Sequence, residues 1–248
     1  MGGVWQIVTK ESGNRPHRKR DSAKTHANIV EVAMQEFAER GLSGARVDRI
    51  AARTRTSKRM IYYYFGSKDG LYRAVLLFYY ERLRAAEQAL DLSHKSPLDS
   101  LKALVEFTFD YHMRNADRVR LVMIENIHKG RSVADMSRRT EVNGSVLKAV
   151  ADICERGVRD GSMRPGLDSF DLYTTIAALC FFNVSNRYTF GTLFKHDMAD
   201  PRESAARRNS VWEVVRSFVK LCESMHKNLF RVRNSAQCAQ YCKVWLCG

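Results

Sequence analysis

Apolar residues recur at intervals of three and four along most of this chain, and they alternate strictly nowhere. In residues 27–40, ANIVEVAMQEFAER, the stripe is formed by Val30, Ala33, Met34 and Phe37. This spacing places the apolar side chains on one face of an α-helix. Because the whole chain holds only four prolines, the pattern can continue with few interruptions. We therefore expect an all-α fold.

Capping residues divide the chain into separate helices. Ser57, Ser67 and Ser96 stand where the first turn of a helix needs an N-cap, and Gly41 supplies the left-handed residue that ends the first helix. The helices expected from these signals span residues 27–40, 46–53, 57–65, 67–89, 96–115, 117–128, 133–160, 168–190 and 202–228. The later helices would form a bundle.

The charge of the chain limits its partners. Lys and Arg number 41 against 27 Asp and Glu, which gives a net charge of +14. Such an excess favours a polyanion, either nucleic acid or an anionic membrane surface. The start of the chain lacks the apolar run of a signal peptide, and the longest apolar stretch, residues 176–184, is shorter than the roughly 20 residues of a membrane span. We expect a cytoplasmic protein with no membrane partner.

Basic residues concentrate over residues 46–59, just before an aromatic run. The segment holds six Lys or Arg residues and one acid, Asp48, which is typical of a phosphate-binding surface. The following IYYYF could form a strand, but Ser57 caps the segment as a helix. On such a helix a tyrosine can pack on sugars or thymine methyl groups and donate a hydrogen bond to phosphate.

These residues carry a resemblance to a known family. Residues 56–75, TSKRMIYYYFGSKDGLYRAV, resemble the helix-turn-helix of the tetracycline-repressor (TetR) family of bacterial transcription regulators, while residues 33–41 and 49–51 resemble its first and second helices. The resemblance implies that Ser57 caps the recognition helix and that Leu71 and Phe65 are core residues. The residues that it and the basic cluster assign to DNA are Arg46, Arg49, Ser57, Lys58, Arg59, Met60, Tyr62, Tyr63, Tyr64 and Lys68.

Within this set, the resemblance gives the residues different roles. Lys58, Arg59 and Met60 would face the bases, the three tyrosines would contact backbone or thymine, and Lys68 would meet a phosphate. The sequence departs from the family at two places. In the turn, Thr54, Arg55 and Thr56 stand where Ala-Gly-Val is usual. At the start of the second helix, Ala45 and Arg46 stand where the family usually has Thr or Ser. Arg55 would then adopt a positive φ, at the cost of mild strain.

The resemblance also implies the organisation of the whole chain. We expect a flexible basic arm over residues 1–21, a helix-turn-helix domain over 22–70, a ligand-binding and dimerisation domain over 71–230, and a tail over 231–248. The last two long helices would join a homodimer. The protein would then be a repressor that binds a palindromic DNA operator and is released by a small-molecule effector.

The effector residues are expected among polar or aromatic positions inside apolar helical runs, where a buried polar group needs a partner. The alternative is that these residues simply fill the core of the bundle, since aromatic stripes at helical spacing belong to a core more often than to a pocket. The candidate set is Phe107, Tyr111, Met123, Glu125, Phe181, Phe182, Asn183 and Arg187.

Two other functions compete with this one. Glu125 and His128 form the ExxH spacing of di-iron helical bundles, but such a metalloenzyme also needs two further glutamates on facing helices, and we expect none at a suitable spacing. No common catalytic motif occurs, and the cysteines form no CxxC pair, so we expect no enzyme, metal or other cofactor. A nonspecific basic protein of nucleic acid or membrane surfaces would not explain why the basic cluster coincides with cap and turn spacing.

Overall fold

The computed structural model describes residues 16–137 and 144–220, and their regular structure is entirely α-helical, as expected. The described residues divide into two compact units. The first contains residues up to 78 together with 124–136, and the second contains 79–123 and the residues from 137 onward. The proposed tail, and the proposed arm up to residue 15, lie outside the described residues. Among the described helices, none is long and apolar enough to cross a membrane.

The first unit is built on α1 (Pro16–Gly44), α2 (Val47–Thr54), α3 (Lys58–Phe65), the first part of α4 (Lys68–Gln88) and α7 (Arg131–Ser137). Its core contains the fully buried side chains of Ile29, Phe37, Ile50, Ile61, Leu71 and Tyr72. The rings of Phe37 and Tyr72 meet edge to face with centroids 5.1 Å apart. These contacts fix α1, α2 and α4 around a common apolar centre.

The first helix is longer than its apolar stripe predicted. α1 begins at Pro16 rather than at residue 27, and its φ turns positive, to 68°, at Gly41, where the sequence predicted its end. The added turns are held by polar and aromatic contacts, since Ser22 bonds to Tyr64 and the rings of His26 and Phe65 lie 4.6 Å apart. An apolar periodicity cannot reveal a helix held in this way.

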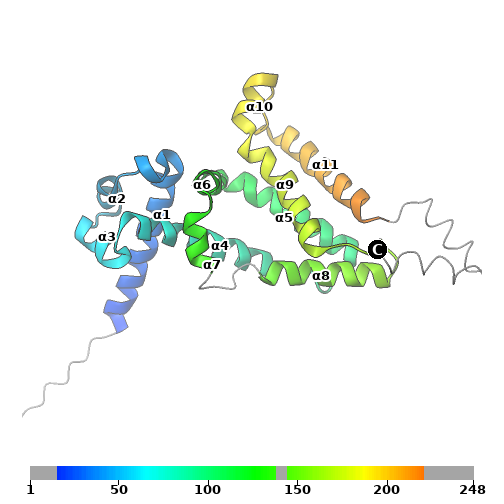
Figure 1. Ribbon diagram of the computed structural model, residues 1–248, viewed down its shortest axis with the longest axis horizontal. Helices are drawn as coiled ribbons and strands as arrows, with labels where there is room; N and C mark the ends of the chain where they lie inside the picture. Colours follow the sequence, from blue (N-terminus) through cyan, green and yellow to red (C-terminus); the bar gives the residue numbers. More distant parts are fainter. Residues whose placement is uncertain (1–15, 138–143, 221–248) are drawn as a thin grey trace, which may run out of the picture. The chain divides into compact units, whose positions relative to one another are not determined.

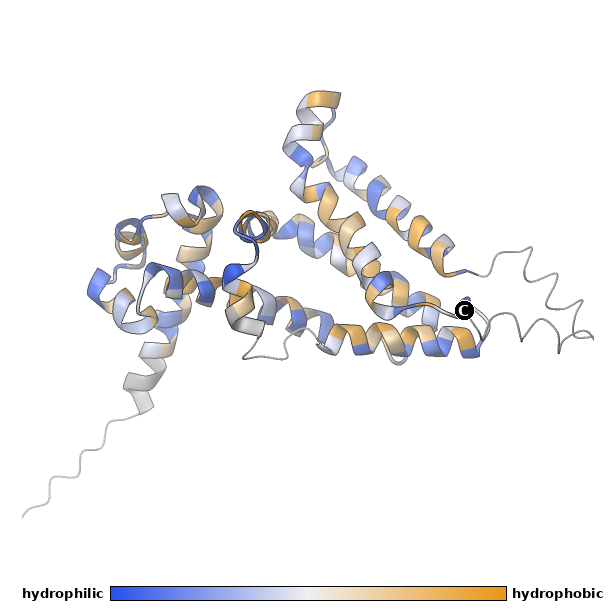
Figure 2. Cartoon of the chain, in the orientation of Figure 1, coloured by the Kyte–Doolittle hydropathy of each residue, from blue (hydrophilic) through white to orange (hydrophobic). Residues whose placement is uncertain are grey.

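The second unit is a bundle centred on α5 (Pro97–Arg114), which packs against α8 (Gly144–Arg159), α9 (Ser169–Ser185) and α11 (Pro201–Val219). The remaining helices of this unit are the last turns of α4, the first part of α6 (Ala116–Ile127), and α10 (Arg187–Phe194) (Figure 1). α9 is apolar along most of its length (Figure 2). The core includes Leu104, Phe109, Ile153, Ile176 and Val215, all of which are buried.

One predicted long helix is broken in this unit. Asn186 leaves the helical conformation with φ −103° and ψ 2°, so residues 168–190 form α9 and the start of α10. Of the helix predicted over residues 133–160, residues 133–137 belong to α7 and residues 144–159 to α8, and residues 138–143 are not among those described. α11 ends when Lys220 becomes extended, and residues 221–228 lie beyond the described part. Apolar periodicity continues through Asn186, which is why it concealed this break.

Candidate nucleic-acid interface and effector region

The turn between α2 and α3 has the predicted backbone. Arg55 adopts φ 53° and ψ 36°, in the left-handed region. Its amide donates to Ala52 O at 3.3 Å, and the Thr56 amide donates to Ala51 O at 3.0 Å, so the turn satisfies the last carbonyls of α2. The Thr54 hydroxyl also donates to Ile50 O at 2.8 Å. The angle between α2 and α3 is therefore fixed by the backbone despite the non-glycine residue.

α3 presents most of its surface to solvent. Ser57 caps it as predicted, because its Oγ accepts from the Met60 amide at 3.2 Å. Ile61 is the buried residue of α3, whereas Tyr63 is 78% exposed. Lys58, Arg59, Met60 and Tyr62 are exposed as well. An exposed helix with this mixture of cationic and aromatic side chains can enter the major groove of DNA.

The three tyrosines of α3 do not point the same way. Tyr62 and Tyr63 are exposed, whereas Tyr64 is half-buried and its hydroxyl lies 2.9 Å from Ser22 Oγ of α1. Phe65, expected in the core, is also only half-buried, while Leu71 is fully buried as expected. DNA contact by all three tyrosines stays a prediction, and Tyr64 also has a structural contact that the sequence did not indicate.

Several cationic side chains near α3 have partners within the protein. Lys58 forms an ion pair with Asp48, and Arg49 lies 4.0 Å from Glu36, which is buried. Glu36 also accepts from the Arg46 amide at 3.2 Å. Exposed ion pairs contribute little stability, so a phosphate can replace the carboxylate partner of Lys58 at low cost. The sequence analysis did not identify Glu36 as a partner of the basic residues. Its position directly before the core residue Phe37, and ten residues before Arg46, was a usable signal.

Lys68 is held inside the first unit. Its Nζ donates to Ser43 O at 3.0 Å and to Ala45 O at 2.9 Å, the carbonyls at the end of α1. A cation at a helix C-terminus is stabilised by the helix dipole. The predicted phosphate contact is untested, but Lys68 clearly orders the junction between α1 and α2, a role that the sequence did not suggest.

The predicted effector residues do not gather in one place. The rings of Phe107 and Tyr111 are in tilted contact with centroids 5.5 Å apart, and the ring of His112 lies beside Tyr111 and 5.8 Å from Phe181. Asn183 is buried, with Nδ2 3.3 Å from Met113 Sδ. These residues belong to α5 and α9 in the second unit.

The other candidates lie elsewhere or have other partners. Phe182 packs on Phe190 of α10, and Arg187 lies 4.6 Å over the Tyr188 ring. Met123, on α6, is exposed. Glu125 Oε1 accepts from the amides of Ser132 and Val133 at 2.6 and 3.2 Å, so it caps α7, while Oε2 has no partner among the described residues.

The sequence did not reveal a buried polar network, which includes Arg84, whose charge acts on His112. Arg84 and Glu87 of α4 form an ion pair, and the Tyr173 hydroxyl of α9 lies 2.8 Å from Arg84 Nη1 and 3.2 Å from Glu87 Oε1. Burial raises the pKa of Glu87, and it raises the pKa of Tyr173 to about 12. The i, i+3 spacing of Arg84 and Glu87 is visible in the sequence. Their common partner Tyr173 is not, because it lies 86 residues after Glu87 and 89 residues after Arg84.

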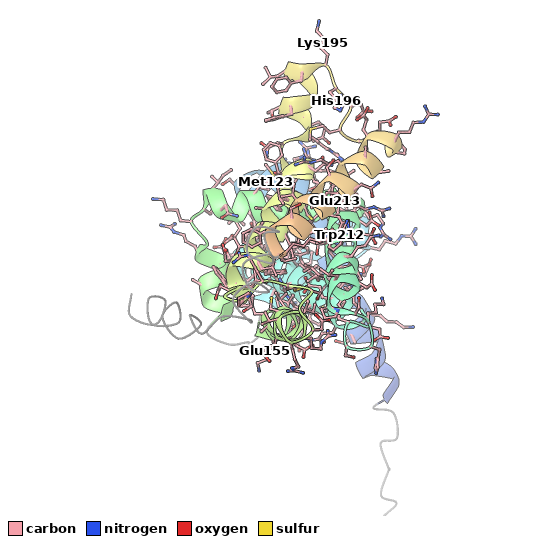
Figure 3. The ribbon with its side chains drawn as sticks, turned by 90° about the vertical axis from the view of Figure 1, so that its right-hand side faces the viewer. Met123, Glu155, Lys195, His196, Trp212 and Glu213 are labelled. Atoms are coloured by element: carbon pink, nitrogen blue, oxygen red, sulfur yellow. The ribbon has the colours of Figure 1, made fainter. Side chains whose placement is uncertain are left out.

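Two open hollows mark the surface of the second unit. One, of about 550 Å³, is lined by residues 87–93 with Ala149 and Asp152. The other, of about 240 Å³, lies between α9 and α11 beside Asn183, His196 and Arg207. Figure 3 places His196 just beneath Lys195 at one end of this unit, with Trp212 and Glu213 further along α11. Among the described residues, no group of His, Cys, Asp and Glu could hold a metal ion.

Comparison with known proteins agrees with the helix-turn-helix geometry. Residues 29–75 match the family described as bacterial regulatory proteins, tetR family, and residues 97–215 match the tetracyclin repressor-like C-terminal domain. The transcriptional repressor NicS of Pseudomonas putida is 32% identical over 199 residues, which covers 80% of this chain and 92% of NicS. The repressor SCO4008 of Streptomyces coelicolor is 35% identical over 142 residues, or 56% of this chain and 69% of its own.

Solved structures show the same fold. The transcriptional regulator SCO4942 of Streptomyces coelicolor has a TM-score of 0.57 at 28% identity, over 79% of this chain and 98% of its own. FadR of Bacillus subtilis, solved with stearoyl-CoA, has a TM-score of 0.60 at 19% identity, over 77% of this chain and 98% of its own. With two matched domains and a relative aligned over nearly its full length, the chain belongs to the TetR family of ligand-responsive helix-turn-helix transcription regulators.

Proposed function

We propose that this regulator is a repressor that acts in the cytoplasm, binds a palindromic operator as a homodimer, and leaves the operator when a small-molecule effector binds its second unit. The observation that carries the proposal is the exposed, cationic and aromatic surface of α3, held by the capped turn at Arg55 and Ser57. Relatives named as repressors, NicS and SCO4008, support repression over activation. The family consists of transcription regulators and is not a family of enzymes.

Homodimerisation is supported by apolar residues left exposed on the last helices. Phe170 of α9 is 64% exposed and Val214 of α11 is 51% exposed, and Leu193 and Phe194 of α10 are exposed as well. Exposed large apolar side chains favour an interface, and a two-fold dimer uses the same surface on both copies. Two copies would place two recognition helices on half-sites about one DNA turn, roughly 34 Å, apart.

The proposal can be tested by selecting bound sequences from a random DNA pool. The expected result is an inverted repeat that binds at two protein chains per duplex, as measured by sedimentation, at least about a thousandfold tighter than mixed DNA at the same salt concentration. Equal affinity for the selected and the mixed DNA would show a nonspecific basic protein instead. A reporter gene behind the selected site then separates repression from activation.

A further inference from the structure

His112 of α5 is a buried polar side chain whose Nδ1 lacks a hydrogen-bond partner among the described residues. It is 7% exposed. Burial, with a smaller contribution from the charge of Arg84, lowers its pKa to about 4, so the ring is neutral at physiological pH. Buried polar groups are nearly always hydrogen-bonded, and an exception needs a cause such as a ligand or a water molecule that completes the site.

The surroundings of His112 are aromatic. The Phe181 ring of α9 meets the imidazole edge to face, at 5.8 Å and an interplanar angle of 89°. The centroid of the Tyr111 ring lies 6.5 Å from that of the imidazole, and Tyr111 is in turn in tilted contact with Phe107. Such walls suit a flat, largely apolar molecule, because aromatic pairs gain energy beyond the apolar area that they bury. The unpaired imidazole then supplies a single polar contact within an apolar wall, as is typical of small-molecule sites.

The cation whose charge acts on His112 is already matched. Arg84, whose charge acts on the imidazole, is paired with Glu87 and bonded to Tyr173. A carboxylate ligand would therefore bring a further charge into a buried region where Arg84 is already paired with a carboxylate. An uncharged group avoids this cost. A neutral imidazole has one donor and one acceptor nitrogen, and a hydroxyl can pair with either, so the match does not depend on the tautomer.

We propose that the effector is an uncharged aromatic molecule bearing a hydroxyl group, which pairs with the imidazole of His112 while its ring packs against Tyr111 and Phe181. This inference rests on the proposed function, because it names the class of effector and the residue that anchors it. A purely apolar molecule would leave the imidazole unpaired. The hydroxyl therefore determines the specificity of the site.

The test compares three probes with the same ring, namely phenol, toluene and benzoate, on the full-length protein. Imidazole signals in ¹H–¹⁵N NMR spectra are recorded, and that of His112 is assigned by its loss in His112→Phe. Phenol is expected to shift the His112 signal and to bind at least about tenfold tighter than toluene, because a site built to hydrogen-bond a hydroxyl rejects the analogue that lacks it. Benzoate is expected to leave the signal unchanged.

Variants provide the matched controls. In His112→Phe, phenol and toluene should bind equally, whereas Phe190→Leu, which alters an exposed ring on α10, should keep the preference of the wild type. Equal binding of phenol and toluene to the wild type would refute the inference, as would a preference for benzoate. An unchanged His112 signal at saturating phenol would also refute it, since the nitrogen is then satisfied by buried water. The comparison of probes on the wild type needs no variant to fold.

The same samples separate this inference from the proposed function. Operator affinity is measured with each probe present. If phenol shifts the His112 signal with the stated preference but the operator stays bound, the effector site stands as a binding site and the release mechanism fails. If another small molecule releases the operator without affecting His112, the proposed function stands and this inference fails.

Discussion

Acid should destabilise this protein through one residue in particular, His112. Its pKa falls from the usual 6.5 to about 4 in the folded chain. Between these values the unfolded chain binds a proton that the folded chain excludes. The stability linked to this group is therefore fully present above pH 6.5 and is lost as the pH falls toward 4.

The magnitude follows from the two pKa values. They differ by about 2.5, and one pKa unit corresponds to about 1.36 kcal/mol, so the full loss is about 3.4 kcal/mol. At pH 5 most of the unfolded chain is protonated and most of the folded chain is not, which gives a loss of about 2 kcal/mol. Since the ring is almost entirely buried, solvent screening reduces this value little.

The assay is urea unfolding at pH 7.5 and pH 5.0 for the wild type and for His112→Phe, which suits the aromatic surroundings and cannot titrate. The wild type should lose about 2 kcal/mol more than the variant over this range. The pKa values of Arg84 and Tyr173 are both raised, so neither group titrates over this range, and the titration of the buried Glu87 cancels in the difference between the two proteins. Equal losses within about 0.5 kcal/mol would refute the reasoning.

Further perturbations test the other polar contacts. Arg55→Gly should be more stable than Arg55→Ala by about 1 kcal/mol of unfolding free energy, because glycine adopts the φ of 53° without strain. Thermal denaturation of the two variants measures the difference. Arg59→Ala should cost about 1–3 kcal/mol of operator binding and relax the base preference at one position per half-site in a mobility-shift titration. Lys68→Ala should instead weaken binding to all DNA sequences alike and reduce the slope of log affinity against log salt concentration by about one. Lys68→Ala should also destabilise the first unit, since two carbonyls lose a charged donor, and unchanged unfolding would contradict that role. Tyr173→Phe should cost about 1–3 kcal/mol in urea unfolding by removing a hydroxyl from a buried ion pair, and a loss below about 0.5 kcal/mol would show that water replaces it.

Local chemistry explains which features could be predicted from the sequence. The cap at Ser57, the positive φ of Arg55 and the cap at Ser96 depend on residues at most a few positions apart, and all three are present. The length of the later helices was overestimated because an apolar stripe continues across Asn186, where only the backbone conformation marks the break.

Tertiary pairing explains what the sequence did not reveal. Lys68 reaches carbonyls 23 and 25 residues earlier in the chain, and a lysine beside a recognition helix also fits a phosphate contact. His112 lies on the apolar stripe of α5, where a histidine usually indicates a satisfied core residue, and only the structure shows that its Nδ1 lacks a partner among the described residues. The candidate effector residues were chosen as polar or aromatic positions in apolar runs, a criterion that does not tell which helix each one faces.

Contacts along α4 give the proposed effector response a physical basis. Lys68, at the start of this helix, is bonded to the end of α1, and Arg84 and Glu87, in its last two turns, are bonded to Tyr173 of α9. α4 is 21 residues long, and it contributes its first part to the first unit and its last turns to the second. A ligand at His112 would lie within reach of the charge of Arg84. It can shift the equilibrium between a made and a broken bond of Arg84 to Tyr173 only by as much as its affinity for the two states differs. Coupling between effector and DNA would therefore depend on whether the bond between Arg84 and Tyr173 survives ligand binding, which is a more specific requirement than tight binding of the ligand.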